Sequence, residues 1–256
     1  MKPQKIQFIF PKNELEDPHA ESLEENIRSH SLIPQGTPFL GQLYLAAEIK
    51  CKLGWEVEIF YEEITPKSKI LASLNGDIVG VSDWFNNHGN ALSYLHAAKQ
   101  KGAITLVGGP NASAMRQKIL NNNSFVDYVF VGDAENSLIE LLSKPTPKGE
   151  RKVISHSSWP NLNQLPFFDL DTLVDKDIIL SSADKYSMHT SGLRGCPKAV
   201  EKGRCTFCSI PVPGLRLMDP DRFFEQIRLM KERYGFTHFF ETGDDLAIPE
   251  YVDALV

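Results

Sequence analysis

The stretch from Ile78 to Gly109, IVGVSDWFNNHGNALSYLHAAKQKGAITLVGG, contains one complete unit of an alternating strand–helix pattern. It begins with the short apolar run 78–81 and closes with a second one at 104–107, both typical of strands that are buried on two faces. Between them, residues 91–100 have helical spacing, and the next glycine, Gly102, is a common helix terminator. Two buried strands joined by a helix indicate a parallel βαβ unit.

The same alternation continues on both sides of this unit. We expect further strands at residues 6–10, 56–61 and 128–131, and helices at 21–29, 38–53, 112–120 and 137–142. Right-handed crossovers between successive strands then produce a doubly wound parallel sheet with helices on both faces. The sequence therefore predicts an α/β, Rossmann-like domain over residues 1–145.

A different organisation is expected in the C-terminal part of the chain. Residues 144–151, KPTPKGER, have the composition of a linker, and we assign residues 146–184 to a connector. Beyond the linker we expect strands at 178–180, 187–190 and 237–241, and a helix at 220–234 with Asp219 as its N-cap. Residues 185–256 would form a second, incomplete domain.

The composition excludes several classes of protein. The 256 residues are 42% hydrophobic and 23% charged, with a net charge of −6, which is unlike a disordered or fibrous chain. A mildly acidic chain has no electrostatic footprint for nucleic acid. The N-terminus lacks a secretory signal, and no apolar run approaches the roughly 18 residues of a membrane span. We expect a cytoplasmic protein that binds neither membranes nor nucleic acid.

Three of the four cysteines lie close together, with the spacing C-x8-C-x2-C: Cys196, Cys205 and Cys208. In a reducing compartment, such a cluster indicates metal binding or catalysis before it indicates disulfides. An iron–sulfur cluster is one interpretation. A structural zinc ion with His189 as fourth ligand is a second, and a redox-active C-x-x-C pair is a third.

The residues around the cysteines carry a resemblance to a known family. Gly-Cys-Pro at 195–197 and Cys-Thr-Phe-Cys-Ser-Ile-Pro at 205–211 resemble the cluster loop of radical S-adenosylmethionine (SAM) enzymes, in particular those with an N-terminal cobalamin-binding domain. The resemblance implies that the three cysteines hold a 4Fe–4S cluster and leave one iron open for SAM. It also implies that Phe207 lies near the adenine, and that a flavodoxin or ferredoxin donates electrons. One departure is the eight-residue spacing after Cys196, which is longer than in the family.

The resemblance extends to the strand exits of the first domain. It implies that cobalamin is contacted there by Ser82, Gly108, Gly109, Gly132 and Glu135. Ligands of open parallel sheets bind at the carboxyl ends of the strands, and these residues lie there. The alternative is that the two adjacent glycines simply form a tight strand-to-helix turn. His19 and His88 are expected to be surface histidines, and Asn111 stands where the family usually has a histidine.

The second domain would complete the SAM site. By resemblance, Glu241 and Asp244 lie beside SAM, although a solvated loop or a helix cap would explain them equally well. Residues 185–256 are too few to close a barrel, so we expect a truncated (β/α) partial barrel. The chain would then be a fragment of a longer protein, or a second chain would complete the barrel. The implied function is reductive cleavage of SAM, coupled to methyl transfer or rearrangement of a small-molecule or peptide substrate. The alternative function is a non-catalytic binding or regulatory protein with a structural zinc site.

Overall fold

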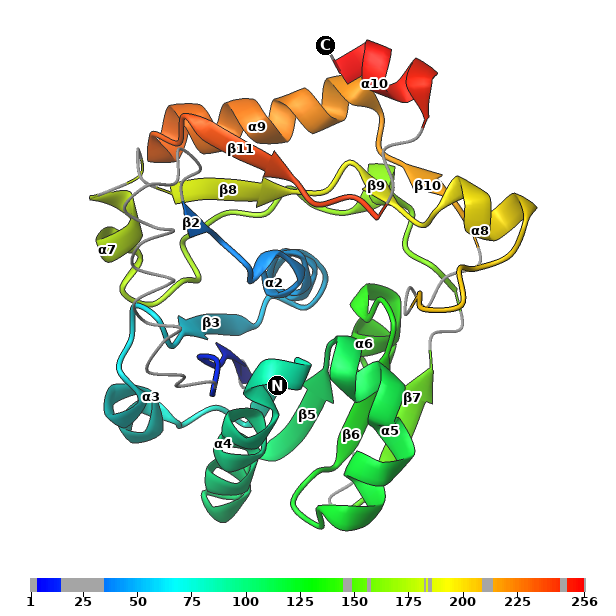
Figure 1. Cartoon of the computed structure of the whole chain (residues 1–256). Coiled ribbons are helices and arrows are strands. Elements are labelled where there is room, and N and C mark those ends of the chain that lie inside the picture. The colour runs from blue at the N-terminus through cyan, green and yellow to red at the C-terminus, as the bar shows by residue number, and fades with distance from the viewer. Residues whose placement is uncertain are drawn as a thin grey trace.

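A computed structural model describes residues 4–14, 35–144, 149–155, 158–181, 183, 186–208, 214–244 and 248–255 (Figure 1). Its largest feature is a six-stranded sheet with the order β3-β1-β4-β5-β6-β7, in which every neighbouring pair is parallel. The strands are β1 (Lys5–Phe10), β3 (Glu56–Tyr61), β4 (Ile78–Ser82), β5 (Ile104–Gly108), β6 (Tyr128–Val131) and β7 (Lys152–Ser155). The fold is therefore mixed α/β and Rossmann-like, as predicted.

The strand order reverses once, between β1 and β4. The chain runs from β1 outward to β3, returns across β1 and continues from β4 toward β7. In doubly wound sheets the crossover helices on the two sides of such a reversal leave on opposite faces, which opens a crevice at the carboxyl ends of the strands. The topology thus places the expected ligand site above β1 and β4.

Helices cover both faces of this sheet. One face packs against α2 (Leu40–Leu53) and α6 (Glu135–Leu142), whereas α3 (Lys67–Ser73), α4 (His88–Gln100) and α5 (Pro110–Asn122) cover the other. Successive residues of β1 point to opposite faces of the sheet. Phe8 therefore packs in the core on the side of α2 and α6, and Ile9 packs in the core on the side of α3, α4 and α5. Helix α2 ends at Gly54, whose φ of 66° is the left-handed conformation of a helix C-cap.

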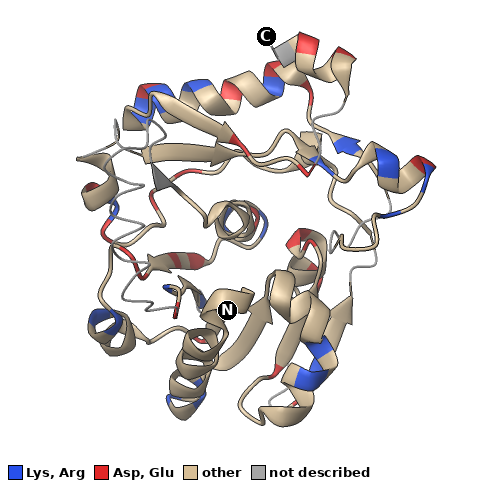
Figure 2. Cartoon of the chain, viewed as in Figure 1, with Lys and Arg blue, Asp and Glu red and all other residues tan. Residues whose placement is uncertain are grey.

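A second, smaller parallel sheet has the order β11-β8-β2. Its strands are β2 (Gln35–Gly36), β8 (Tyr186–Thr190) and β11 (His238–Glu241), and β8 is connected to β11 through the helix α9 (Pro220–Tyr234). As predicted, Asp219 caps α9, because its side chain accepts a hydrogen bond from the backbone N–H of Asp221 at 3.0 Å. Acidic and basic residues are interspersed along α9 (Figure 2).

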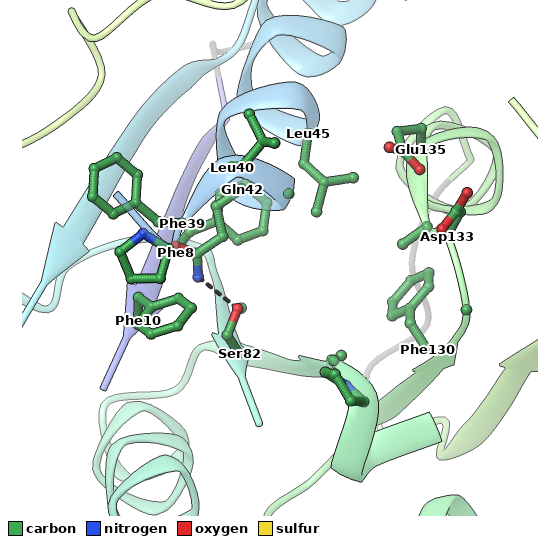
Figure 3. Close-up of a pocket in the computed structure, with 18 of the residues that line it drawn as sticks. Phe8, Phe10, Phe39, Leu40, Gln42, Leu45, Ser82, Phe130, Asp133 and Glu135 are labelled. Carbon is green, nitrogen blue, oxygen red and sulfur yellow. Dashed lines mark hydrogen bonds between the residues drawn. The ribbon is translucent and has the colours of Figure 1, made fainter. Parts of the chain in front are cut away.

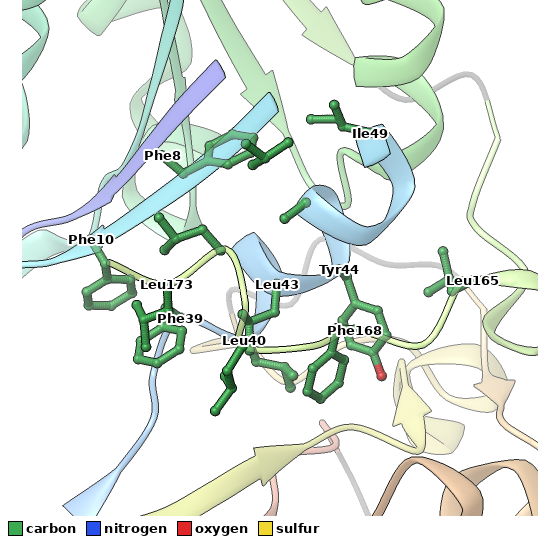
Figure 4. Close-up of a cluster of buried hydrophobic side chains, with 14 of the residues drawn as sticks. Phe8, Phe10, Phe39, Leu40, Leu43, Tyr44, Ile49, Leu165, Phe168 and Leu173 are labelled. Carbon is green, nitrogen blue, oxygen red and sulfur yellow. The ribbon is translucent and has the colours of Figure 1, made fainter. Parts of the chain in front are cut away.

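Helix α2 lies between the two sheets and joins them through one apolar core (Figures 1 and 4). Tyr44 of α2 meets Phe168 of the connector edge-on, with ring centroids 5.0 Å apart. The same core contains Phe8 of the large sheet and Met188 of the small one. Because the two sheets share this core, their carboxyl ends are held facing each other.

The structure differs from the sequence-based prediction in the connector. The predicted strand at 178–180 is wrong, because these residues belong to the short helix α7 (Lys176–Leu180). Of its apolar residues, only Ile179 is buried, whereas Ile178 is 49% exposed. The apolar run at 178–180 therefore reflects one buried side chain of a helix and not a strand. Strand β7 lies within the range assigned to the connector. Its sequence, KVIS, contains only two consecutive apolar residues, which is too short a run to predict a strand, and the strand lies at the edge of the sheet.

The remaining described elements are short. They are η1 (Phe85–Asn87), η2 (Leu162–Gln164), β9 (Leu193–Arg194), α8 (Pro197–Glu201), β10 (Arg216–Leu217) and α10 (Pro249–Leu255). Strands β9 and β10 form an antiparallel ribbon. The predicted helix at 21–29 and His19 lie outside the described residues. Among the helices that are described, none has the length and apolar character needed to cross a lipid bilayer.

Candidate ligand cavity between the two sheets

A cavity of about 500 Å³ lies where the carboxyl ends of the two sheets face each other (Figure 3). This volume is within the range of pockets that bind small molecules and cofactors. Its wall is mainly apolar and aromatic, and includes Phe8, Phe10, Phe39, Leu45, Trp84 and Phe130. The opposite wall comes from β8 and the segment that follows it, through His189, Ser191 and Leu193.

The cavity brings together most of the residues proposed from the sequence to bind a cofactor. Those at its wall are Ser82, Gly108, Gly109, Gly132, Glu135 and Asp244. They come from the exits of β4, β5, β6 and β11, so segments more than 160 positions apart in sequence meet at one site. Glu241, Phe207 and the three cysteines are not part of this wall.

The two adjacent glycines at the exit of β5 have different roles. Gly109 has a φ of 113°, and a Cβ there would lie 2.6 Å from the backbone oxygen of Asp83. It therefore serves the tight turn, as the alternative interpretation held. A Cβ on Gly108 would meet only Phe130, at an ordinary 3.7 Å. The glycine at that position leaves room on the cavity side of the strand exit.

Asp83 is a buried carboxylate that the sequence analysis did not single out. It lies just behind the cavity wall, 2.9 Å from Nδ1 of His88, and accepts a hydrogen bond from Nδ2 of Asn111 at 3.0 Å. Burial raises the pKa of Asp83 above its ordinary value, although the His88 and Asn111 contacts oppose the rise. This cluster ties the exits of β4 and β5 together. His88 is 38% exposed, but it is engaged by Asp83 and is not a simple surface residue.

Gln42 of α2 is a second polar residue that the helical pattern concealed. It is buried at the cavity wall, where its Nε2 donates to the backbone oxygen of Ile9 at 2.9 Å and to Oγ of Ser82 at 3.1 Å. These bonds connect α2 to β1 and β4 at the strand reversal (Figure 3). The sequence could have indicated its importance only through the presence of a single glutamine among the apolar positions of a helix.

Four charged side chains connect the first sheet to the β9–β10 ribbon. Arg194 contacts Glu135 at 2.7 Å and Asp133 at 3.1 Å, and Arg216 contacts Asp133 at 2.7 Å. Burial alone would raise the pKa of Asp133, but the two guanidinium groups hold it below its ordinary value. Arg194 also lies over the ring of Tyr44, at 5.3 Å from its centroid. The network is neutral overall and fixes the two sides of the cavity to each other.

Glu241 and Asp244 hold the segment that leads into the cysteines. Glu241 accepts hydrogen bonds from the backbone N–H groups of Gly192 and Gly243 and from the hydroxyl of Thr190. Burial raises the pKa of Glu241, although these hydrogen bonds oppose the rise. Asp244 accepts a hydrogen bond at 2.6 Å from the backbone N–H of Gly195. The contacts of both carboxylates within the chain are therefore with the backbone and side chains around the start of the cysteine loop.

Gly195 has no room for a side chain. Its φ is 98°, and a Cβ there would lie 1.9 Å from the backbone oxygen of Gly214. The Gly-Cys-Pro sequence therefore has a steric cause in this chain, since the two ends of the cysteine loop touch at this residue. The loop leaves the cavity wall immediately after Arg194, which lines it.

The three cysteines lie on this loop, and each is partly exposed. The long spacing after Cys196 contains the short helix α8, where only turns were expected. Nζ of Lys198 donates to Sγ of Cys205 at 3.0 Å, and the pKa of Lys198 is raised chiefly by Cys205, with smaller contributions from Cys196 and Cys208. Sγ of Cys205 therefore lies in contact with an ammonium group.

The three thiols of the loop are not arranged around one common point. Among the described residues, no three or more His, Cys, Asp and Glu side chains are arranged to hold a metal ion. His189, the candidate fourth zinc ligand, lies at the cavity wall and packs against Phe240 with ring centroids 5.5 Å apart. Phe207 is 88% exposed. The cysteine ligand assignments stay predictions.

No protein-family model matches the chain, and no curated protein is significantly similar to it.

Proposed function

We propose that this chain is part of a radical SAM enzyme in which Cys196, Cys205 and Cys208 bind a 4Fe–4S cluster. The observation that carries the proposal is the position of the cysteine loop. It follows β8 of a parallel βαβ unit, begins beside the wall of a ligand-sized cavity and is held by a carboxylate, Asp244, that lines the same cavity. Chemistry at the loop would therefore take place next to a bound ligand.

The donor set fits such a cluster in kind and in number. Thiols are the ligands that iron–sulfur clusters prefer, and three of them leave one iron open for SAM. Nζ of Lys198 donates a hydrogen bond to Sγ of Cys205, so a positive charge lies beside one of the three proposed ligands. Because the thiols are partly exposed and not yet gathered, the loop would have to close around the cluster. In many metalloproteins, metal binding drives local folding of this kind.

When bound, the cluster would supply one electron, received from a flavodoxin or ferredoxin, to the sulfonium of SAM. The chain's own residues would position the reactants. Glu241 and Asp244 hold the start of the loop through the backbone of Gly192 and Gly195. The apolar side chains of the cavity exclude water, which protects reactive species from side reactions.

The cavity is also the proposed site of a second ligand, cobalamin, but at about 500 Å³ it would enclose only part of so large a cofactor. It lies at the strand reversal of a doubly wound sheet, where the exit glycine Gly108 leaves open space. Ser82, Gly108, Gly132 and Glu135 would contact the cofactor from the sheet edge. Cobalamin would supply a carrier for a methyl group, and the reaction class that follows is methyl transfer or rearrangement of a small-molecule or peptide substrate.

Anaerobic reconstitution with iron and sulfide tests the cluster. We expect about four irons per chain with the broad visible absorption of a 4Fe–4S cluster. Cys196→Ala, Cys205→Ala and Cys208→Ala should each lose most of this absorption. Cys51→Ala is the matched control, because Cys51 is an exposed cysteine on α2 and should be dispensable.

Metal analysis of the untreated protein separates the two candidate functions. One tightly bound zinc per chain, with no cluster after reconstitution, would favour the structural zinc site and end the radical SAM proposal. If the cluster forms, reduction with dithionite in the presence of SAM should release 5′-deoxyadenosine.

A further inference from the structure

We propose that the imidazole of His189 is the polar recognition group of the cavity, and that the cavity takes a small, neutral aromatic or alicyclic ligand that carries a hydroxyl group. The inference goes beyond the proposed function and depends neither on the cluster nor on cobalamin. It is argued from the fixed place of His189 at the cavity wall, from its open ring nitrogens and from the apolar surroundings of the ring.

His189 is held firmly on the wall. It lies in β8, the central strand of the smaller sheet, and its backbone N–H donates to the hydroxyl oxygen of Thr37 at 3.0 Å. Its ring packs against Phe240, its direct neighbour on β11, with ring centroids 5.5 Å apart. Because the strand and the stacked ring both restrain the side chain, the imidazole would lose little conformational freedom when a ligand binds.

The ring nitrogens of His189 are open to a ligand. Within the described part of the chain, neither nitrogen has a hydrogen-bond or ion-pair partner, and each keeps accessible surface. The hydroxyl groups on the same wall are different, because Ser191 and Thr242 already donate to backbone oxygens, at 3.1 and 2.8 Å. His189 is therefore a polar group of this wall whose hydrogen bonds are left for a bound molecule.

The surroundings of the ring favour a neutral hydroxyl group as its partner. Burial lowers the pKa of His189 below its ordinary value of 6.5, so the ring is uncharged at neutral pH. A neutral imidazole has one N–H donor and one acceptor nitrogen, and a hydroxyl group can pair with either. The negative charge of Asp244, which lines the same cavity, opposes an anionic ligand. An ammonium group would have to leave water for a mainly apolar wall.

The rest of the cavity selects the body of the ligand. Its volume of about 500 Å³ is that of a site for a small molecule, and Phe39 and Phe130 lie at its wall (Figure 3). Trp84 adds a third aromatic side chain. Aromatic rings of this kind pack well against flat apolar ligands. A ring system with one hydroxyl group would therefore bury its body against these side chains and satisfy His189 with its polar end.

Binding of two probes of the same shape tests this inference. 2-Naphthol carries a hydroxyl group, whereas 2-methylnaphthalene carries a methyl group of similar size that neither donates nor accepts. Fluorescence titration of the full chain gives the ratio of their two dissociation constants. His189→Phe should shift this ratio against 2-naphthol by about three- to tenfold, which is the loss of one hydrogen bond. His189→Gln keeps a donor and an acceptor, so it should retain more of the wild-type ratio than His189→Phe.

Two further variants control for folding and for the place of binding. His96→Phe is the matched control, because His96 of α4 also stacks on a phenylalanine, Phe125, at 5.1 Å, but does not line the cavity. It should keep the wild-type ratio. Gly108→Leu places a side chain in the open space at the exit of β5, so both probes should bind about tenfold more weakly.

Four results would overturn the inference. They are an unchanged ratio in His189→Phe, an equal shift of the ratio in His96→Phe, undiminished binding of both probes to Gly108→Leu, and failure of the wild type to bind 2-naphthol. The cluster is tested separately by reconstitution, so each of these results leaves the radical SAM proposal standing.

Discussion

The carboxyl edge of the six-stranded sheet and the cysteine loop meet at one cavity but are built in opposite ways. At the sheet edge, Asp83 and Gln42 are buried and bonded to neighbouring strands and helices. On the loop, the cysteines are partly exposed, and the ammonium of Lys198 is bonded to one of the thiols. The sheet edge is preorganised before any ligand arrives, whereas the loop depends on what it binds. Ligand selectivity is therefore expected from the sheet, and metal-dependent ordering from the loop.

The largest expected effect falls on the sheet side. Phe130→Ala removes a side chain that is 4% exposed in β6 and packs in the core beneath the cavity. We expect the free energy of unfolding to fall by about 3–5 kcal/mol, as is usual for a buried phenylalanine. Urea denaturation measures it. A loss below about 1 kcal/mol would mean that the sheet edge is not rigidly packed.

Substitution of Gly195, which lies between the two regions, should lower stability almost as strongly. Gly195→Ala places a methyl group against the backbone oxygen of Gly214, and we expect a loss of about 2–4 kcal/mol together with a lower iron content after reconstitution. Gly203→Ala is the matched control, since Gly203 also has a positive φ but open space around it. It should cost only about 1 kcal/mol. Equal effects of the two substitutions would contradict the crowding at Gly195.

Acidification should weaken the ion pairs that join the regions. The pKa of Asp133 is lowered in the folded protein, so its contribution to stability is fully present above the unfolded value of about 3.8 and is lost as the pH falls through the lower folded value. Unfolding free energies measured between pH 6 and pH 2 should therefore fall less steeply in Asp133→Asn than in the wild type. Parallel curves would show that Asp133 does not couple to Arg194 and Arg216.

The smallest effect on stability is expected on the loop itself. Phe207 is 88% exposed, so Phe207→Ala should change the free energy of unfolding by less than about 0.5 kcal/mol. If Phe207 contacts the adenine, the same substitution should weaken SAM binding to the reconstituted protein. Isothermal titration with SAM measures this. Unchanged SAM affinity would remove Phe207 from the site, and a large loss of stability would show that the loop is more tightly packed than it is here.

How much of this could be predicted from sequence depended on burial. Strands β4 and β6 are apolar and buried on both faces, so the sequence alone was sufficient to predict them. The edge strand β7, with two apolar residues, and the two-residue strand β2 are too short to show a recognisable pattern. In the connector, a run of three apolar residues could not distinguish α7 from a strand.

Only some residues of the candidate site could likewise be predicted from the sequence. The exit glycines and Glu135 were predicted to lie near one another because strand exits in a parallel sheet can be located from the strands themselves, and they do line one cavity. Asp83 and Gln42 were missed because their importance arises from tertiary contacts, with Asn111 in one case and Ile9 in the other. Nor could the sequence show that Asp244 reaches back to Gly195 across the loop.

The pairing of β2 with β8 has a consequence for biosynthesis. Gly36 pairs with Ser187, so the smaller sheet needs a strand made early and a strand made about 150 residues later. At about 5–20 residues per second, a ribosome takes about 8–30 seconds to cover that interval. During this time the first strand must wait unpaired while the six-stranded sheet assembles beside it. The order of synthesis thus favours completion of the large sheet before the small one can close over it.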